Sequence, residues 1–188
     1  MRRIPLSLLI AAACTAHAGQ QSGGSDSGLL GGGWYIAPVG EVTYTGNAPG
    51  HLDYAGGFGL GIGKMLGDFN IEARPLWVHY SGNAATHGPR VDLSSDLWGG
   101  VVDAQYVFSR GAWQPYAVIA AGGATWGTAG VRSTRFLGEA GAGIQYAVTD
   151  TFLARADLRY RANLNTDGTG PGDQNGVVAN LGIVLPID

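Results

Sequence analysis

Ionisable side chains at every second position are the part of this sequence most able to do chemistry. In the segment TFLARADLRYR, residues 151–161, Arg155, Asp157, Arg159 and Arg161 alternate with apolar residues. Carboxylates and guanidinium groups at this spacing could pair with one another, or a carboxylate could act as a general acid or base. Because successive side chains of an extended strand point to opposite faces, the four groups would share one face of a single strand.

Other alternating segments carry acids, bases or amides on one face in the same way. The inward-facing ion-pair network that we predict from them consists of Glu41, Glu72, Arg74, Asp103, Glu139, Gln145, Arg155, Asp157 and Arg159. Arginine stays protonated in proteins, so it gives a carboxylate a structural partner and not a proton acceptor. We therefore expect a plug of paired charges, and no residue is assigned a catalytic role.

The opposite face of the same segments is apolar, with aromatic residues near the segment ends. The aromatics that we predict to lie at membrane interfaces are Trp34, Tyr44, Phe69, Trp98, Phe108, Trp113, Trp126, Phe136 and Tyr146. A soluble sandwich turns its charged face to water, and a lipocalin-type barrel encloses an apolar interior. An apolar face bordered by aromatics instead favours a barrel with lipid outside and charge within.

Clusters of Gly, Pro, Asn and Asp divide the chain into eight alternating segments. The predicted strands are residues 33–45, 54–64, 68–80, 96–108, 113–126, 135–148, 151–161 and 176–186. The long polar connections GNAPGHLD, SGNAATHGPRVDLSS, GTAGVRST and ANLNTDGTGPGDQNG alternate with the tight turns MLGD, SRGA and TD. This alternation is typical of outer-membrane proteins. The sequence predicts an all-β fold, an eight-stranded antiparallel up-and-down transmembrane β-barrel.

The N-terminal sequence MRRIPLSLLIAAACTAHA combines two arginines, an apolar run and a small-x-small end. These features predict that residues 1–18 are a secretory signal peptide, followed by a flexible leader at 19–31 and one barrel domain at 32–188. A lipoprotein signal ending at Cys14 is the alternative, although Ala11 stands where such signals usually have leucine.

Composition excludes several function classes. The chain has 11 Lys and Arg against 14 Asp and Glu, and loss of Arg2 and Arg3 with the signal leaves 9 against 14, a net charge of −5. Basic stripes are missing, which disfavours a nucleic-acid partner. His51 and His87 fall in different connections without further His or Cys nearby, so we expect no metal and no other cofactor. After the signal, no apolar run is long enough for a membrane-spanning helix.

Three stretches resemble the OmpA-like barrel of the outer-membrane β-barrel superfamily. The segment GAGIQYAVTDTFLARADLRYR, residues 141–161, has glycine-rich, aromatic, turn and arginine positions in the order of that family. FNIEARPLW (69–77) and WQPYAVIAAGG (113–123) are similar to the wider superfamily, and the likeness extends over about residues 32–186. It implies export to the bacterial outer membrane, with lipid, lipopolysaccharide and the barrel-assembly machinery as partners and a possible ligand at the external loops.

The resemblance also implies a lumen filled by inward acids and bases. Glu72 and Arg155 stand at matching positions, whereas Gln145 occurs where the family has an acid and Asp103 where it has a lysine. We therefore expect a rewired network in which Arg74 and Arg159 serve as the alternative bases.

An enzymatic alternative rests on the tripeptide His79-Tyr80-Ser81. It resembles the His-x-Ser of the outer-membrane lipid A deacylase, in which a base and a nucleophilic hydroxyl share one face of a strand. That family carries the motif in its penultimate strand, where this sequence has Arg159 and Arg161. We therefore predict a non-enzymatic barrel that serves envelope integrity or surface interaction through four external loops. A lipid A-modifying enzyme that uses His79 and Ser81 is the alternative.

Overall fold

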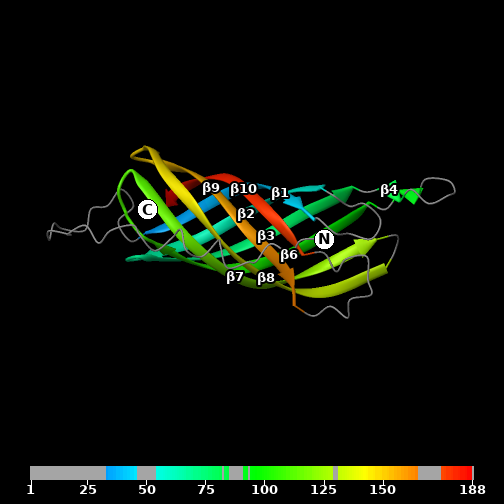
Figure 1. Ribbon diagram of the computed structural model, residues 1–188. Helices are drawn as coiled ribbons and strands as arrows, with labels where there is room; N and C mark the ends of the chain where they lie inside the picture. The colour runs from blue at the N-terminus through cyan, green and yellow to red at the C-terminus, as the bar shows by residue number, and fades with distance from the viewer. Residues whose placement is uncertain are drawn as a thin grey trace, which may run out of the picture.

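The chain forms a closed antiparallel β-barrel (Figure 1). A computed structural model describes residues 33–45, 54–81, 83–84, 91–92, 94–128, 131–164 and 175–187. The barrel strands are β1 (Trp34–Tyr44), β2 (Tyr54–Leu66), β3 (Phe69–Ser81), β6 (Ser95–Val107), β7 (Trp113–Thr128), β8 (Val131–Thr149), β9 (Phe152–Asn163) and β10 (Gly176–Ile187). Each strand pairs with its neighbour in sequence, and β1 pairs with β10 to close the barrel. The predicted eight-stranded up-and-down fold is confirmed.

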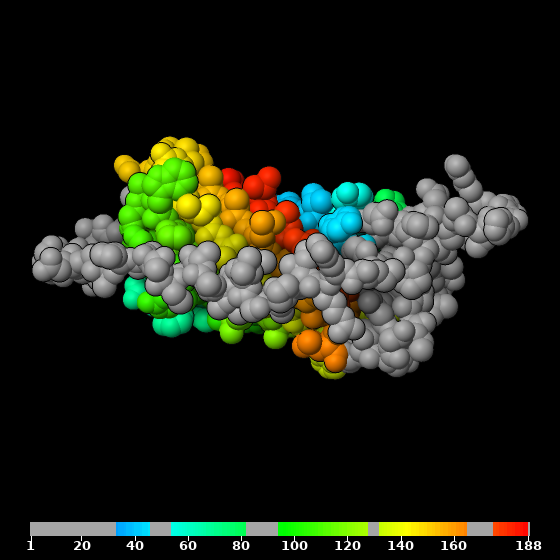
Figure 2. All heavy atoms as spheres, in the orientation of Figure 1, coloured from blue at the N-terminus to red at the C-terminus, as the bar shows by residue number. Residues whose placement is uncertain are grey.

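Closure joins the two ends of the barrel sequence. Trp34 is opposite Ile187 in the β1–β10 ladder, and Tyr44 is opposite Val177. In Figure 2 the red atoms of β10 accordingly adjoin the blue atoms of β1. The predicted signal peptide and leader lie outside the described residues.

The two ends of the barrel differ in their connections. At one end, called the tight-turn end, short connections join β2 to β3, β6 to β7 and β8 to β9, and β1 begins and β10 ends there. Gly67 in the first of these turns has a φ of 61°, a left-handed conformation that glycine adopts without strain. The other connections lie at the opposite, long-loop end. There, β4 (Asn83–Ala84) and β5 (Val91–Asp92) form a separate two-stranded sheet.

Alternating burial shows why these sequences form barrel strands. Along β1 the side chains are alternately exposed and buried, as the period of two predicts. The inner face of β2 has glycines at positions where side chains from neighbouring strands occupy the space. A Cβ added at Gly61 would overlap the carboxyl group of Glu72, and one at Gly63 would overlap the ring of Tyr35. The glycines therefore make room for the side chains that fill the lumen.

The connection between β7 and β8 is shorter than the sequence predicted. We expected residues 127–134 to form a long polar loop, but β7 continues to Thr128 and β8 begins at Val131. Thr125 pairs with Thr134 in this ladder. Threonine and valine favour extended backbone because their side chains branch at Cβ, so the loop prediction was wrong for this connection.

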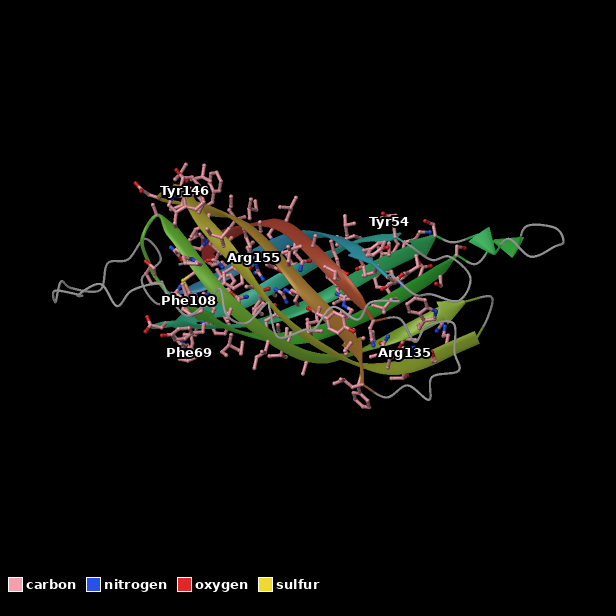
Figure 3. The ribbon with its side chains drawn as sticks, in the orientation of Figure 1. Tyr54, Phe69, Phe108, Arg135, Tyr146 and Arg155 are labelled. Carbon is pink, nitrogen blue, oxygen red and sulfur yellow. The ribbon has the colours of Figure 1, made fainter. Side chains whose placement is uncertain are left out.

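Eight of the nine predicted interface aromatics are exposed on the outer face. The outward residues are Trp34, Tyr44, Phe69, Trp98, Phe108, Trp113, Phe136 and Tyr146. Trp113 and Tyr146 pack against each other at the tight-turn end, with ring centroids 4.4 Å apart, and Figure 3 shows Phe69, Phe108 and Tyr146 near that end. That these rings meet membrane interfaces stays a prediction.

Trp126 is the exception, because it is 5% exposed and points into the lumen. Its ring centroid lies 4.5 Å from that of Tyr80. Trp126 is an odd number of positions from Trp113 on the same regular strand, and such residues occupy opposite faces. The prediction of an outward Trp126 was therefore wrong, and the strand period alone could have corrected it.

Candidate functional site

Five strands bring the predicted charged residues together inside the barrel. Glu41 comes from β1, Glu72 and Arg74 from β3, Asp103 from β6, and the remainder from β8 and β9. Each of the nine predicted residues is at most 4% exposed. Figure 3 shows Arg155 in the middle of the barrel, away from its two ends.

Arg155 is the centre of a first group of contacts in the lumen. Its Nη1 donates to Glu72 Oε2 at 2.7 Å, and its Nε donates to Asp157 Oδ2 at 3.2 Å and to Tyr116 Oη at 3.0 Å. Tyr116 donates its hydroxyl to Asp157 Oδ2 at 2.6 Å, and Tyr35 donates to Glu72 Oε2 at 3.0 Å. Both carboxylates thus share hydrogen bonds with arginine and tyrosine.

Arg159 joins acids from three strands. Its Nη1 donates to Asp103 Oδ2 at 2.8 Å and to Glu139 Oε2 at 3.1 Å, while its Nε donates to Asp157 Oδ1 at 2.6 Å. Arg74 Nη2 also donates to Glu139 Oε2, at 2.8 Å. Asp103 therefore lies beside a base supplied by β9.

Arg161 belongs to the same network, although the sequence prediction did not include it. Its Nη1 and Nη2 donate to Glu41 Oε1 and Oε2 at 2.6 and 2.9 Å, and its Nε donates to Glu139 Oε1 at 2.8 Å. Thr43 donates to Glu41 Oε1 at 3.0 Å. Arg161 is an even number of positions from Arg159, so the strand period was the signal that places it on the inner face.

Three further residues of the network are not charged and also escaped the sequence prediction. They are Tyr35, Tyr116 and Asn180. Asn180 Nδ2 donates to Asp157 Oδ1 at 2.8 Å, and Arg74 Nη1 donates to Asn180 Oδ1 at 3.5 Å. Each of the three lies an even number of positions from an inward-facing residue on its own strand, which places it on the inner face. This spacing does not reveal which residue it contacts.

Gln145 differs from the other members of the predicted network. It is fully buried, yet neither atom of its side-chain amide has a hydrogen-bond partner in the protein. Gln145 lies opposite Arg155 in the β8–β9 ladder, but Arg155 directs its hydrogen bonds to Glu72, Asp157 and Tyr116. The structure therefore buries Gln145 beside the ion pairs without including it in them.

The chemistry of the charged lumen is that of permanent ion pairing. The arginines cannot accept protons, and the carboxylates accept hydrogen bonds from guanidinium or hydroxyl donors. Among the described residues, no group of His, Cys, Asp and Glu is arranged to hold a metal ion. The arrangement can fill and stiffen the barrel.

The lumen toward the long-loop end is largely apolar, with the buried guanidinium of Arg135 over the ring of Trp126. An apolar cluster fills it, composed of Ala55, Leu76, Val78, Tyr80, Leu97, Val101, Ala120, Ala124, Trp126 and Leu137. A smaller apolar cluster at the tight-turn end contains Tyr35, Met65 and Leu153. The charged residues are therefore bordered by apolar clusters toward both ends, together with Arg135 at the long-loop end and Asn70 and Gln105 at the tight-turn end.

Solved structures with a similar fold are bacterial outer-membrane proteins. Neisserial surface protein A matches with a TM-score of 0.60 and 17% identity, over 82% of this chain and 97% of that one. The N-terminal β-barrel domain of Pseudomonas aeruginosa OprF gives 0.50 and 18%, over 81% and 97%. Yersinia pestis Ail, in complex with the heparin analogue sucrose octasulfate, gives 0.52 and 18%, over 83% and 99%. No protein-family model and no curated protein matches the chain.

The chain has the fold of an outer-membrane β-barrel. Its exterior agrees with that fold, because large apolar residues such as Leu158, Ile119 and Leu181 are at least 61% exposed on it. The described residues include no helix of the length and hydropathy that a membrane span requires. In barrels of this type, tight turns face the periplasm and the longer connections face outward.

The two residues of the enzymatic alternative lie on the outer face of this outer-membrane fold, near the long-loop end. His79 and Ser81 are on the same side of β3, and His79 is opposite Asp96 of β6. The distance from His79 Nδ1 to Asp96 Oδ1 is 2.9 Å, and both side chains are about half exposed. No described hydrogen bond joins Ser81 to His79. The sequence reasoning missed Asp96, since only the strand register places it beside the histidine.

Proposed function

We propose that the protein is an integral outer-membrane barrel whose lumen is plugged by charge and which serves envelope integrity. The observation that carries the proposal is the buried network around Arg155, Arg159 and Arg161, whose guanidinium groups donate to acids from β1, β3, β6, β8 and β9. Side chains that tie so many strands together brace the barrel wall. They also occupy the axis that a solute would follow.

Apolar packing toward the long-loop end supports the plug. An eight-stranded barrel has an interior only just wide enough for side chains. Tyr80 and Trp126 are in ring contact there, and Leu97 and Val78 are at most 2% exposed. The buried charged side chain at this end is Arg135, whose guanidinium lies 6.0 Å from the ring centroid of Trp126 and helps to fill the lumen. We therefore propose that the barrel does not conduct solutes at an appreciable rate.

Surface interaction through the external connections is the second part of the proposal. The barrel would be surrounded by lipopolysaccharide and lipid, and the barrel-assembly machinery would insert it. Residues 46–53, 82–94, 129–130 and 165–175 contain four acids and one base, namely Asp53, Asp92, Asp167, Asp173 and Arg90. This charge balance favours a neutral or cationic partner. It disfavours a polysulfated partner of the kind that sucrose octasulfate represents in the Ail complex.

Two measurements on the refolded protein test this function. An unheated sample should migrate differently from a heated one on a denaturing gel, because a closed barrel resists unfolding by detergent. In planar lipid bilayers the same sample should give no stepwise conductance. Equal gel mobility would contradict the membrane barrel, and steady single-channel steps would contradict the plug while leaving the barrel intact.

A hydrolytic function is the second candidate, and the hydrogen bond between His79 and Asp96 favours it. A carboxylate at Nδ1 would orient the imidazole so that Nε2 could take a proton from Ser81. The test is the mass of lipid A after incubation with the folded protein. Loss of an acyl chain that disappears in Ser81→Ala and persists in Thr125→Ala would support a hydrolase, and unchanged lipid A would exclude this activity.

A further inference from the structure

The outer face of the barrel strands carries few charged or imidazole side chains. Within the described strands they are Lys64 at the tight-turn end, and His79, Asp96 and Arg132 toward the long-loop end. The remaining outward positions are apolar, small, aromatic or hydroxyl-bearing. A carboxylate on a lipid-facing surface is costly unless it lies at the membrane boundary. His79, Asp96 and Arg132 therefore mark this boundary on β3, β6 and β8.

The imidazole of His79 is held in a defined orientation. Its Nδ1 lies 2.9 Å from Asp96 Oδ1, and its ring stacks on Trp77 with centroids 6.1 Å apart and an interplanar angle of 26°. With Nδ1 engaged by the carboxylate, Nε2 is the nitrogen left for another group. In the protonated ring, Nε2 donates a hydrogen bond, as a phosphate oxygen requires.

An aromatic surface continues from His79 toward the middle of the barrel. The ring centroids of Phe58 and Trp77 are 5.3 Å apart, and those of Trp77 and Trp98 are 6.0 Å apart. Phe58 and Trp98 are 58% and 60% exposed. Exposed rings therefore lie next to the polar pair of His79 and Asp96, on the side toward the middle of the barrel. This arrangement suits an amphiphile whose acyl chains point into the bilayer and whose head group lies at the membrane boundary.

Glycines leave the surface open on both sides of the polar pair. Gly56 lies opposite His79 on β2, and Gly127 lies opposite Asp96 on β7. A Cβ added at Gly56 would meet no heavy atom within 4 Å, and one at Gly127 would meet only the backbone oxygen of Asp96, at 4.0 Å. Arg132 of β8 lies opposite Gly127 in the β7–β8 ladder, and its side chain is exposed. The order around the barrel is thus Gly56, His79, Asp96, Gly127 and Arg132. A ligand that lies across Gly127 can reach the carboxylate, the guanidinium and the imidazole.

We propose that this surface, defined by His79, Asp96, Arg132 and the rings of Trp77 and Trp98, binds the phosphorylated sugar head group of a lipopolysaccharide molecule. His79 and Arg132 donate to phosphate, Asp96 accepts from a sugar hydroxyl, and the rings contact the acyl chains. A glycolipid fits better than a phospholipid because the site offers both an acceptor and two donors around an open, flat area. The inference rests on the proposed outer-membrane function, which places this end in the outer leaflet.

Binding can be measured with the full barrel in lipid nanodiscs, prepared with phospholipid alone or with added lipopolysaccharide. The wild-type protein should have a higher thermal midpoint in the lipopolysaccharide discs. The double variant His79→Ala/Asp96→Ala should lose this increment. The matched double variant Tyr44→Ala/Tyr54→Ala removes another outward cross-strand pair at the same end, with rings 5.2 Å apart, and should retain it.

Each other outcome also decides the proposal. An equal increment in the His79→Ala/Asp96→Ala variant, or no increment in the wild-type protein, overturns it. An equal loss of midpoint in both kinds of disc also overturns it, because the pair would then stabilise the barrel without a glycolipid. If the alanine variant does not fold, His79→Gln/Asp96→Asn replaces it under the same criteria. Heat-modified gel mobility of each sample reports the barrel itself, so failure of this site is distinguishable from failure of the proposed function.

Discussion

The two parts of the lumen solve the same packing problem with different chemistry. In the middle, Arg155 and Arg159 are surrounded by carboxylates. Toward the long-loop end Leu97, Tyr80 and Trp126 belong to an apolar cluster, with the guanidinium of Arg135 beside the ring of Trp126. All of these residues are buried and lie on inner faces of the same sheet. The barrel fold therefore requires a filled interior, and it does not require that the filling be polar.

The difference matters for how each part responds to mutation. Removal of one member of a buried ion pair leaves its partner charged and without compensation. Removal of an apolar side chain leaves a cavity, whose cost depends on how far the neighbours relax. We expect the charged part to be more sensitive to single substitutions, and more readily repaired by a second one.

The largest effect is expected for Arg155→Ala. This change removes the guanidinium that Glu72 and Asp157 share. We expect the free energy of unfolding to fall by about 3 to 5 kcal/mol, the typical cost of breaking a buried pair. Urea unfolding of the barrel in micelles or liposomes, followed by tryptophan fluorescence, measures it. An unchanged midpoint would mean that the charged part tolerates an unpaired acid.

The matched control for Arg155→Ala is the double variant Arg155→Met/Glu72→Leu. It replaces both partners of the 2.7 Å pair by apolar side chains of similar length. Well-packed apolar replacements of buried ion pairs are often neutral or stabilising. The double variant should therefore be more stable than Arg155→Ala alone. A double variant that is less stable than Arg155→Ala would show that the unpaired Glu72 carboxylate is not the source of the loss.

A smaller effect is expected for Leu97→Ala in the apolar part. Leu97 is 2% exposed and belongs to the cluster that contains Tyr80 and Trp126. Truncation of a buried leucine typically costs about 2 to 5 kcal/mol, and we expect about 2 to 3 kcal/mol because side chains near the end of a barrel can relax into the space. The same unfolding assay measures it. A loss larger than that of Arg155→Ala would reverse the comparison.

The smallest effect, and the only gain, is expected for Gln145→Leu. The amide is fully buried without a protein partner, so burying it costs about 1 to 3 kcal/mol that an apolar side chain of similar size avoids. We expect a stabilisation of about 1 kcal/mol. Gln145→Ala serves as the control, because it removes the amide and leaves a cavity. A clear destabilisation by Gln145→Leu would indicate that the amide binds water or another group.

The strand period explains how much of this molecule the sequence could predict. A period of two assigns each residue to a face, so the eight strands, their order and most inward charges were predictable. The same rule did place Arg161 on one face with Arg155 and Arg159, although the predicted network omitted it, and it would have excluded Trp126 from the outward aromatics. Those errors came from incomplete use of the rule and not from missing information.

Pairing between distant strands is what the sequence could not predict. Glu41 and Arg161 are 120 positions apart, and their contact depends on how β10 is offset between β1 and β9. The partnership of His79 with Asp96 depends in the same way on the register of β3 with β6. Face assignments are local, whereas register is fixed by the closure of the whole barrel.

The length of β7 and β8 has a consequence for recognition at the long-loop end. These strands have 16 and 19 residues, and the other barrel strands have 11 to 13. Their ladder continues to the pair of Thr128 and Val131. β6 stays paired with β7 up to Gly127, whereas β8 extends beyond Leu137, where its pairing with β9 ends. An antibody or a bacteriophage that binds this hairpin would contact an already ordered surface. Binding would therefore cost little conformational entropy of the hairpin. A peptide grafted between these two strands would be displayed on an ordered, hydrogen-bonded hairpin.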